Sequence, residues 1–180
     1  MSNPNSEDDA RLVRRVAGGD EKALQVLVDR HQGLLVRLCF GILQDHEEAE
    51  DVASWAFVKF WQTASQFRGD CSIKAYLCRI ALNLSRDRLA RLPVSLSLTD
   101  DLSARETTAT DPRWDRIEMG LRSLSAEDRE LLTLHYLDDL SYSELEVVLG
   151  ANYSVLKTRL VRARERLREV LGLNDECRKA

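Results

Sequence analysis

One segment near the C-terminus, residues 141–171, constrains the fold of this chain more than any other. It reads SYSELEVVLGANYSVLKTRLVRARERLREVL. Ser141 and Glu144 have the spacing of a capping box, which predicts that a helix begins near Ser141. Gly150 favours the left-handed backbone conformation that often ends a helix. The segment therefore predicts two short helices joined by a tight turn.

The second of these helices is far more basic than the first. Asn152 or Ser154 can cap it, and its expected inner face is formed by Val155, Leu156, Leu160, Ala163 and Leu167. Between these apolar positions stand Lys157, Arg159, Arg162, Arg164, Arg166 and Arg168. A helix, a glycine turn and a basic second helix form the pattern of a DNA-reading helix-turn-helix. An amphipathic helix pair with a solvated basic face is the alternative interpretation.

Proline usage and hydrophobic periodicity both indicate an all-α fold. The chain of 180 residues contains only three prolines, and none of them falls inside a periodic segment. Apolar residues recur at helical spacing, and no convincing run alternates as a strand does. The length suffices for one domain or two small ones.

The periodic segments divide into two groups. Helices are expected at residues 7–17, 20–43, 46–65 and 72–91, and again at 112–124 and 125–137 before the pair described above. Residues 92–111 are rich in Ser, Thr and Asp and lack an apolar stripe. This stretch is too long for a simple connection inside one compact domain, so it predicts a flexible linker.

Charge is distributed unevenly along the chain, which has a net charge of −4. Residues 68–91 hold six Lys and Arg against two Asp and Glu, and residues 155–180 hold eight against four. Two basic segments in an otherwise acidic chain suit two separate DNA contacts. Ordinary charge variation among helices is the alternative.

The segment at 72–91 has a polar row opposite its apolar face. Arg79, Asn83 and Arg86 follow one another at i, i+4 and i+7, so they share one side of the helix. Basic groups with aromatic residues nearby, such as Phe67 and Tyr76, suit single-stranded DNA, whose bases can stack on rings. The aromatic residues can equally belong to the core.

The segment at 46–65 carries two apolar stripes, whereas a surface helix needs only one. Either this helix is buried on all sides, or its second stripe docks a partner protein with Trp55 as an anchor.

Several other classes of protein find little support. No signal peptide and no apolar run near 18 residues is present, so we expect a cytoplasmic protein without membrane insertion. Cys39, Cys71, Cys78 and Cys177 lack metal-binding spacing and are expected to act as small apolar residues, with a Cys71–Cys78 redox pair as the alternative. No phosphate loop, metal triad or nucleophile–base arrangement indicates an enzyme, and no metal or cofactor is expected.

Several motifs, in the expected order, resemble extracytoplasmic-function (ECF) sigma factors of the sigma-70 superfamily. Residues 20–44 and DHEEAEDVASWAFVKFW at 45–61 resemble parts of sigma domain two, and FRGDCSIKAYLCRIALNLSRDRLAR at 67–91 resembles its −10 reading segment. LSAEDRELLTLHYLDDLSYSELEVVLG and LKTRLVRARERL resemble sigma domain four. The resemblance covers nearly the whole chain and implies domain two at 1–91, a linker at 92–111 and domain four at 112–180.

The resemblance also implies the partners and the binding residues. Domain two would bind the clamp of the large subunit of core RNA polymerase through Asp51, Val52, Ser54, Trp55 and Val58. It would capture the opened −10 element of promoter DNA through Gly69, Asp70, Cys71, Ser72, Arg79, Asn83 and Arg86. Domain four would read the −35 element as duplex through Asn152, Ser154, Lys157, Thr158, Arg159 and Arg162. An anti-sigma factor would hold the protein inactive.

The sequence departs from the family pattern at three places. Ser54-Trp55 stands where the family usually has Gln-Glu, and Ser154-Val155 stands in a turn that usually reads Gly-Thr-Val. Glu146 replaces a small residue, and a buried unpaired carboxylate would cost several kcal/mol. We therefore expect Glu146 to pair with a basic residue of the second helix or to lie at the rim.

The leading hypothesis is a sigma factor that directs transcription initiation. A helix-turn-helix regulator that acts without polymerase is a second hypothesis, and the Arg79–Asn83–Arg86 row and the two-sided 46–65 helix argue against it. A sigma-like protein that has lost promoter reading and only titrates a partner is a third.

Overall fold

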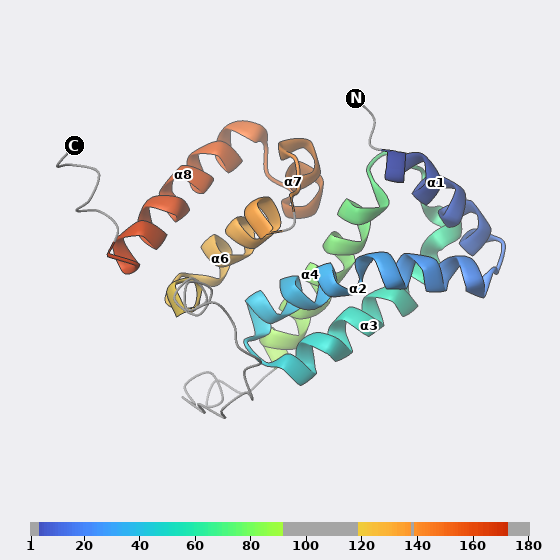
Figure 1. The fold of residues 1–180 in the computed structure, drawn as a ribbon, viewed down its shortest axis with the longest axis horizontal. Coiled ribbons are helices and arrows are strands. Elements are labelled where there is room, and N and C mark those ends of the chain that lie inside the picture. Colours follow the sequence, from blue (N-terminus) through green and yellow to red (C-terminus); the bar gives the residue numbers. More distant parts are fainter. Residues whose placement is uncertain (1–3, 92–118, 138, 173–180) are drawn as a thin grey trace.

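The computed structural model describes residues 4–91, 119–137 and 139–172, and every regular element in these residues is helical. The predicted all-α fold is confirmed. The N-terminal region contains α1 (Pro4–Ala17), α2 (Glu21–Leu43), α3 (His46–Thr63), the short 3₁₀ helix η1 (Ala64–Gln66) and α4 (Ile73–Arg91). The C-terminal region contains α6 (Ala126–Leu132), η3 (Thr133–Leu137), α7 (Tyr142–Leu149) and α8 (Tyr153–Val170) (Figure 1).

The helix predicted at 125–137 begins where expected but changes its winding. Ser125 caps α6 by accepting a hydrogen bond from the backbone N–H of Asp128. The second half, η3, is a π-helix. Residues 119–122 are helical, as predicted for the end of the 112–124 segment. The expected linker at 92–111 lies outside the described residues.

Helix ends follow the local signals in the sequence. Asp20 caps α2 by accepting from the backbone N–H groups of Lys22 and Ala23. Ser141 and Glu144 form the predicted capping box at the start of α7, and Gly150 ends α7 with φ +65°. Such a cap contributes about 1 kcal/mol, because it satisfies an N–H group that has no partner inside the helix.

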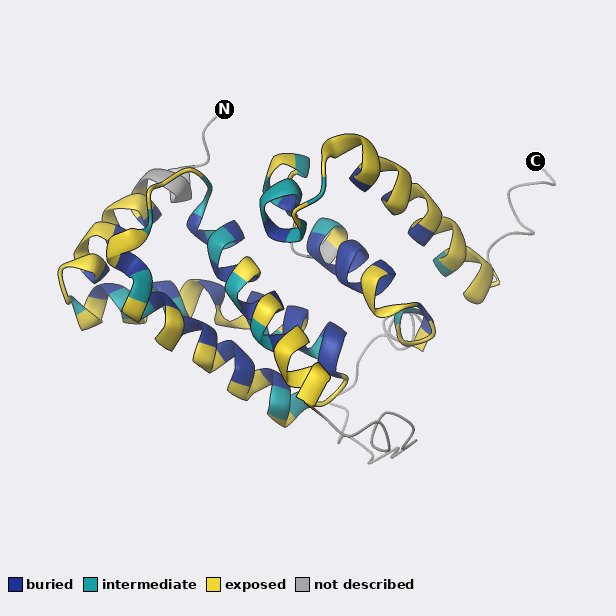
Figure 2. Ribbon diagram, turned by 180° about the vertical axis from the view of Figure 1, so that it is seen from behind, coloured by how far each residue is buried: buried dark blue, intermediate teal, exposed yellow. Residues whose placement is uncertain are grey.

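Apolar side chains from both regions form the interior. Leu27, Leu35 and Phe60 are fully buried in the N-terminal region, and Leu145 and Leu156 are fully buried in the C-terminal region. Figure 2 shows the buried residues on the inward faces of the helices, whereas α8 is exposed along most of its length. Burial of each large apolar side chain contributes about 1.5–3 kcal/mol.

The two regions pack against each other. α7 lies against α4, and α6 lies against α2, so the buried apolar residues form one continuous cluster. The Arg122 guanidinium lies 5.8 Å from the centroid of the Phe40 ring, a cation–π contact between the regions. None of the helices in the described residues is long and apolar enough to cross a membrane.

Candidate nucleic-acid interface

The polar row of α4 is present on the surface as predicted. Arg79, Asn83 and Arg86 are exposed, while Leu77, Cys78, Ala81, Leu82 and Ser85 face the interior. The row extends over about 10 Å of the helix, since each residue adds about 1.5 Å. Both guanidinium groups can donate to phosphate oxygens, and the Asn83 amide can donate to or accept from a base edge.

The loop before α4 is fixed at both of its ends. The Phe67 and Tyr76 rings are in edge contact with centroids 5.0 Å apart. Ser72 caps α4, because its Oγ accepts from the backbone N–H of Ala75 at 3.1 Å. Between these anchors Gly69 adopts φ +78°, a conformation that favours glycine. Phe67 and Tyr76 thus serve as packing anchors, as the alternative interpretation of the aromatic residues held.

The four predicted loop residues differ in exposure. Gly69 and Asp70 are exposed, while Cys71 and Ser72 are half-buried. Burial raises the pKa of the Cys71 thiol, and the neighbouring Asp70 carboxylate adds to the effect. The loop therefore presents its glycine and its aspartate to solvent, and its neutral thiol lies deeper.

The predicted recognition helix, α8, exposes its basic side. All six predicted −35 residues lie on the surface, whereas Leu156, Leu160 and Ala163 are buried. The prediction for Val155 was wrong: this side chain is 44% exposed and does not join the inner stripe. The reason is its register, one position before Leu156 on a helix with 3.6 residues per turn.

Several of these surface groups already have partners inside the protein. The Asn152 side chain caps α8 by accepting from the backbone N–H of Val155, and Thr158 Oγ1 donates to the carbonyl of Ser154. Arg159 pairs with Glu127. Within the described residues, Lys157 and Arg162 carry the exposed charges of the predicted set that no ion pair engages.

Glu146 has a partner, but not the expected basic side chain. Its Oε1 accepts a hydrogen bond from the backbone N–H of Tyr153 at 2.6 Å. The carboxylate is half-buried and sits at the N-terminus of α8, where the helix dipole favours a negative charge. Glu146 therefore fixes the turn between α7 and α8 instead of interrupting it.

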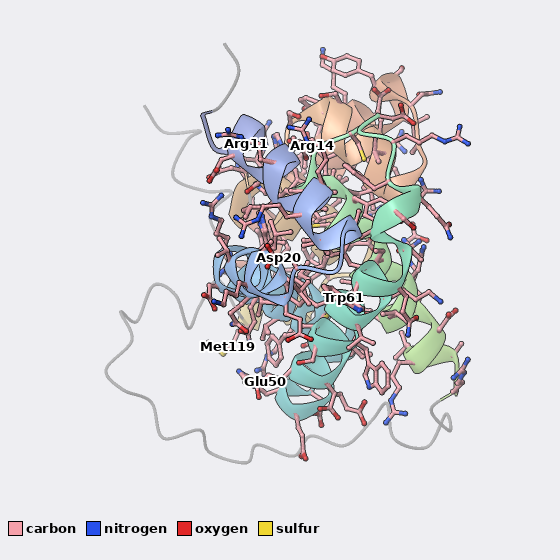
Figure 3. The ribbon with its side chains drawn as sticks, turned by 90° about the vertical axis from the view of Figure 1, so that its right-hand side faces the viewer. Arg11, Arg14, Asp20, Glu50, Trp61 and Met119 are labelled. Atoms are coloured by element: carbon pink, nitrogen blue, oxygen red, sulfur yellow. The ribbon has the colours of Figure 1, made fainter. Side chains whose placement is uncertain are left out.

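The predicted polymerase-binding residues on α3 separate into an exposed set and one buried residue. Asp51, Ser54, Trp55 and Val58 are exposed, and Trp55 retains 63% of its accessible surface. Val52 is only 7% exposed and belongs to the core, so it takes no part in this face. Figure 3 shows α3 running from near Glu50 to near Trp61 along this side of the molecule. α3 is thus not buried on all sides.

Two acidic residues that the sequence did not single out contact the predicted −10 residues. Ser72 Oγ donates to Glu144 Oε1 at 2.6 Å, and one Arg86 terminal nitrogen lies 3.0 and 3.1 Å from the two carboxylate oxygens of Glu130. Burial raises the pKa of Glu130, and the Arg86 charge opposes that rise. Partners 72 and 44 residues apart leave no local signal in a sequence.

Comparisons with known proteins match both regions. The family model described as Sigma-70 region 2 matches residues 27–92, and the model described as Sigma-70, region 4 matches residues 114–167. The RNA polymerase sigma-H factor of Pseudomonas aeruginosa is 29% identical over 92% of this chain and 94% of its own. The ECF RNA polymerase sigma-E factor of Escherichia coli K12 is 31% identical over 87% of this chain and 91% of its own.

A solved structure has a similar fold. CnrH, determined in complex with the cytosolic domain of CnrY, superposes with a TM-score of 0.73 at 25% sequence identity. The match covers 93% of this chain and 99% of CnrH.

Proposed function

This chain belongs to the ECF group of RNA polymerase sigma factors, and from that premise we propose which of its surfaces reads each part of a promoter. It is an alternative sigma factor that directs transcription initiation, and it catalyses no reaction itself. The observation that carries the assignment of surfaces is the presence of two exposed basic faces, one on α4 and one on α8, in different helical regions.

The N-terminal region captures the −10 element as a single strand. Arg79 and Arg86 position the strand through its phosphates, while Asn83 contacts a base that has left the stack. The exposed loop residues Gly69 and Asp70 form the rim of the site that receives this base. Because this surface binds the separated strand better than the duplex, binding shifts the promoter towards the open state.

The C-terminal region reads the −35 element as duplex DNA. α8 is about 27 Å long and presents its first turns to the major groove, as the second helix of a helix-turn-helix does. Lys157 and Arg162 are the principal contacts, since their charges are available for bases or phosphates. Asn152, Ser154, Thr158 and Arg159 complete the set, although Arg159 must exchange its ion pair with Glu127 for DNA.

Core polymerase binds the exposed face of α3. Trp55 offers a large apolar side chain in a setting of Asp51, Ser54 and Val58, and such an aromatic anchor suits the centre of a protein interface. The clamp of the large polymerase subunit is the proposed contact. A tryptophan here makes the contact less polar than the Gln-Glu pair usual in the family.

An anti-sigma factor is the proposed inhibitory partner. The structural relative CnrH was determined with the cytosolic domain of CnrY bound, which supports a protein partner for this fold. No residue of this chain identifies that partner.

The assignment of the −10 surface is tested by separating promoter binding from promoter opening. Asn83→Ala holoenzyme should bind promoter duplex nearly as well as the wild type, and it should open the duplex less, because the amide contacts only the flipped base. Gel retardation measures the binding step, and permanganate reactivity of unpaired thymines measures the opening step. Asp87→Ala, one turn further along α4, is the matched control and should change neither. Equal losses of binding and opening in Asn83→Ala would remove its special role.

A further inference from the structure

The proposed −10 surface is partly covered by the protein's own C-terminal region. Ser72 and Arg86, both assigned to the DNA contact, are bound by Glu144 of α7 and Glu130 of α6. The inference drawn from this arrangement rests on the proposed function of α4, since it concerns access to that same surface.

The two contacts attach the C-terminal region at opposite ends of α4. Ser72 precedes the helix and Arg86 lies 14 positions later, which separates the two points by about 21 Å along the axis. α7 lies against α4 between them, as Figure 1 also shows. A DNA strand following the Arg79–Asn83–Arg86 row would therefore meet α6 and α7 on its path.

The carboxylates occupy the donors that a phosphate would use. A carboxylate and a phosphate both accept hydrogen bonds through paired negative oxygens, and arginine binds either one. Glu130 presents both oxygens to one nitrogen of Arg86, and Glu144 accepts from the Ser72 hydroxyl. Ser72 and Arg86 cannot donate to these carboxylates and, from the same atoms, to DNA.

We propose that Glu130 and Glu144 form an intramolecular latch, in which two carboxylates of the C-terminal region hold the −10 surface closed in the free protein. Opening the latch separates the two regions and exposes α4 to the promoter strand. The Arg86 side chain is half-exposed, so its pair with Glu130 is accessible to salt and to competing phosphate oxygens. The same competition that opens the latch thus delivers the DNA.

The latch is tested on the full chain without polymerase. Small-angle X-ray scattering should give the wild type a radius of gyration of roughly 16 Å plus the contribution of its tails. Glu130→Gln, Glu144→Gln and the double variant should all expand. The double variant should also bind a fluorescein-labelled single-stranded DNA oligonucleotide of mixed sequence about 5-fold more tightly or better. Asp8→Asn is the matched control: it removes a carboxylate paired with Arg30 inside the N-terminal region, and it should change neither quantity.

Two results would overturn the latch. One is an unchanged radius of gyration in all three variants. The other is expansion without tighter DNA binding, since the contacts would then not mask the −10 surface. Glu130 is buried, so thermal unfolding must show that Glu130→Gln still folds. Glu144 is half-buried and provides an independent variant. Loss of polymerase-dependent initiation by the wild type would instead contradict the proposed function, whatever the scattering shows.

Discussion

Single residues of similar chemistry have opposite fates on α3, and exposure distinguishes them. Phe60 is fully buried, whereas Trp55 is 63% exposed on the same helix. Leaving a large aromatic side chain in water forgoes the stabilisation that burial would supply. An exposed tryptophan flanked by Val58 at 42% exposure is therefore better explained by a binding role than by folding.

Trp55→Ala should weaken binding to core polymerase by about 2 kcal/mol, or roughly 30-fold, because a buried aromatic anchor is lost from the interface. The free energy of unfolding should change by no more than about 0.5 kcal/mol, as for other exposed positions. Surface plasmon resonance and urea unfolding measure the two effects. Lys59→Ala, a neighbouring exposed residue, should change neither. A Trp55→Ala protein that unfolds would show that the side chain supports the core.

The sequence predicted well those residues whose role depends on near neighbours. Ser141 with Glu144, Gly150 and Asn152 all act within one helical turn, so their spacing is sufficient to place them. Val52 and Val155 were misplaced. Each lies at the edge of an apolar stripe, where a small rotation of the helix decides between core and solvent.

At the scale of one element, α8 combines a narrow apolar stripe with a broad basic surface. Leu156, Leu160 and Ala163 hold it to α6 and α7, and the rest of its circumference remains exposed. Ion pairs engage Arg159 and Arg166 with Glu127 and Asp128 of α6. The same helix thus uses some of its cations for packing and leaves others for DNA.

Lys157→Ala and Arg162→Ala should each reduce the affinity for −35 duplex DNA by about 1–3 kcal/mol if they contact bases. A contact to phosphate would instead weaken all sequences alike and lower the salt dependence of binding. Fluorescence anisotropy with promoter and scrambled duplexes at several salt concentrations separates the two cases. Arg168→Ala, in the last turn of α8, is the control and should have little effect. Unchanged affinity in both variants would refute the assignment of this helix.

The winding of η3 shows where element prediction stops. Apolar periodicity placed a helix over 125–137, but the change to a π-helix at Thr133 left no mark in the pattern. Leu134 and Leu140 are nevertheless fully buried, and His135 Nδ1 lies 3.0 Å from the carbonyl of Leu140. These tertiary contacts, which form after the chain has turned, accompany the altered winding.

At the scale of the whole molecule, the sequence predicted two helical regions but not their packing. The caps and apolar stripes that define each region are local. The contacts between regions join residues such as Arg86 with Glu130 and Phe40 with Arg122, far apart in the chain. The candidate DNA surfaces were therefore predictable as exposed basic faces, whereas the covering of one of them by Glu130 and Glu144 was not.

The central claim is that this chain gives core polymerase a preference for particular promoters through two separate surfaces. The most direct measurement is transcription in vitro with purified core polymerase and a promoter library, followed by sequencing of the transcript ends. We predict that the chain adds a set of start sites that share a −10 and a −35 motif, and that Arg162→Ala relaxes only the −35 motif. Transcripts that start at the same positions with and without the chain would contradict the account.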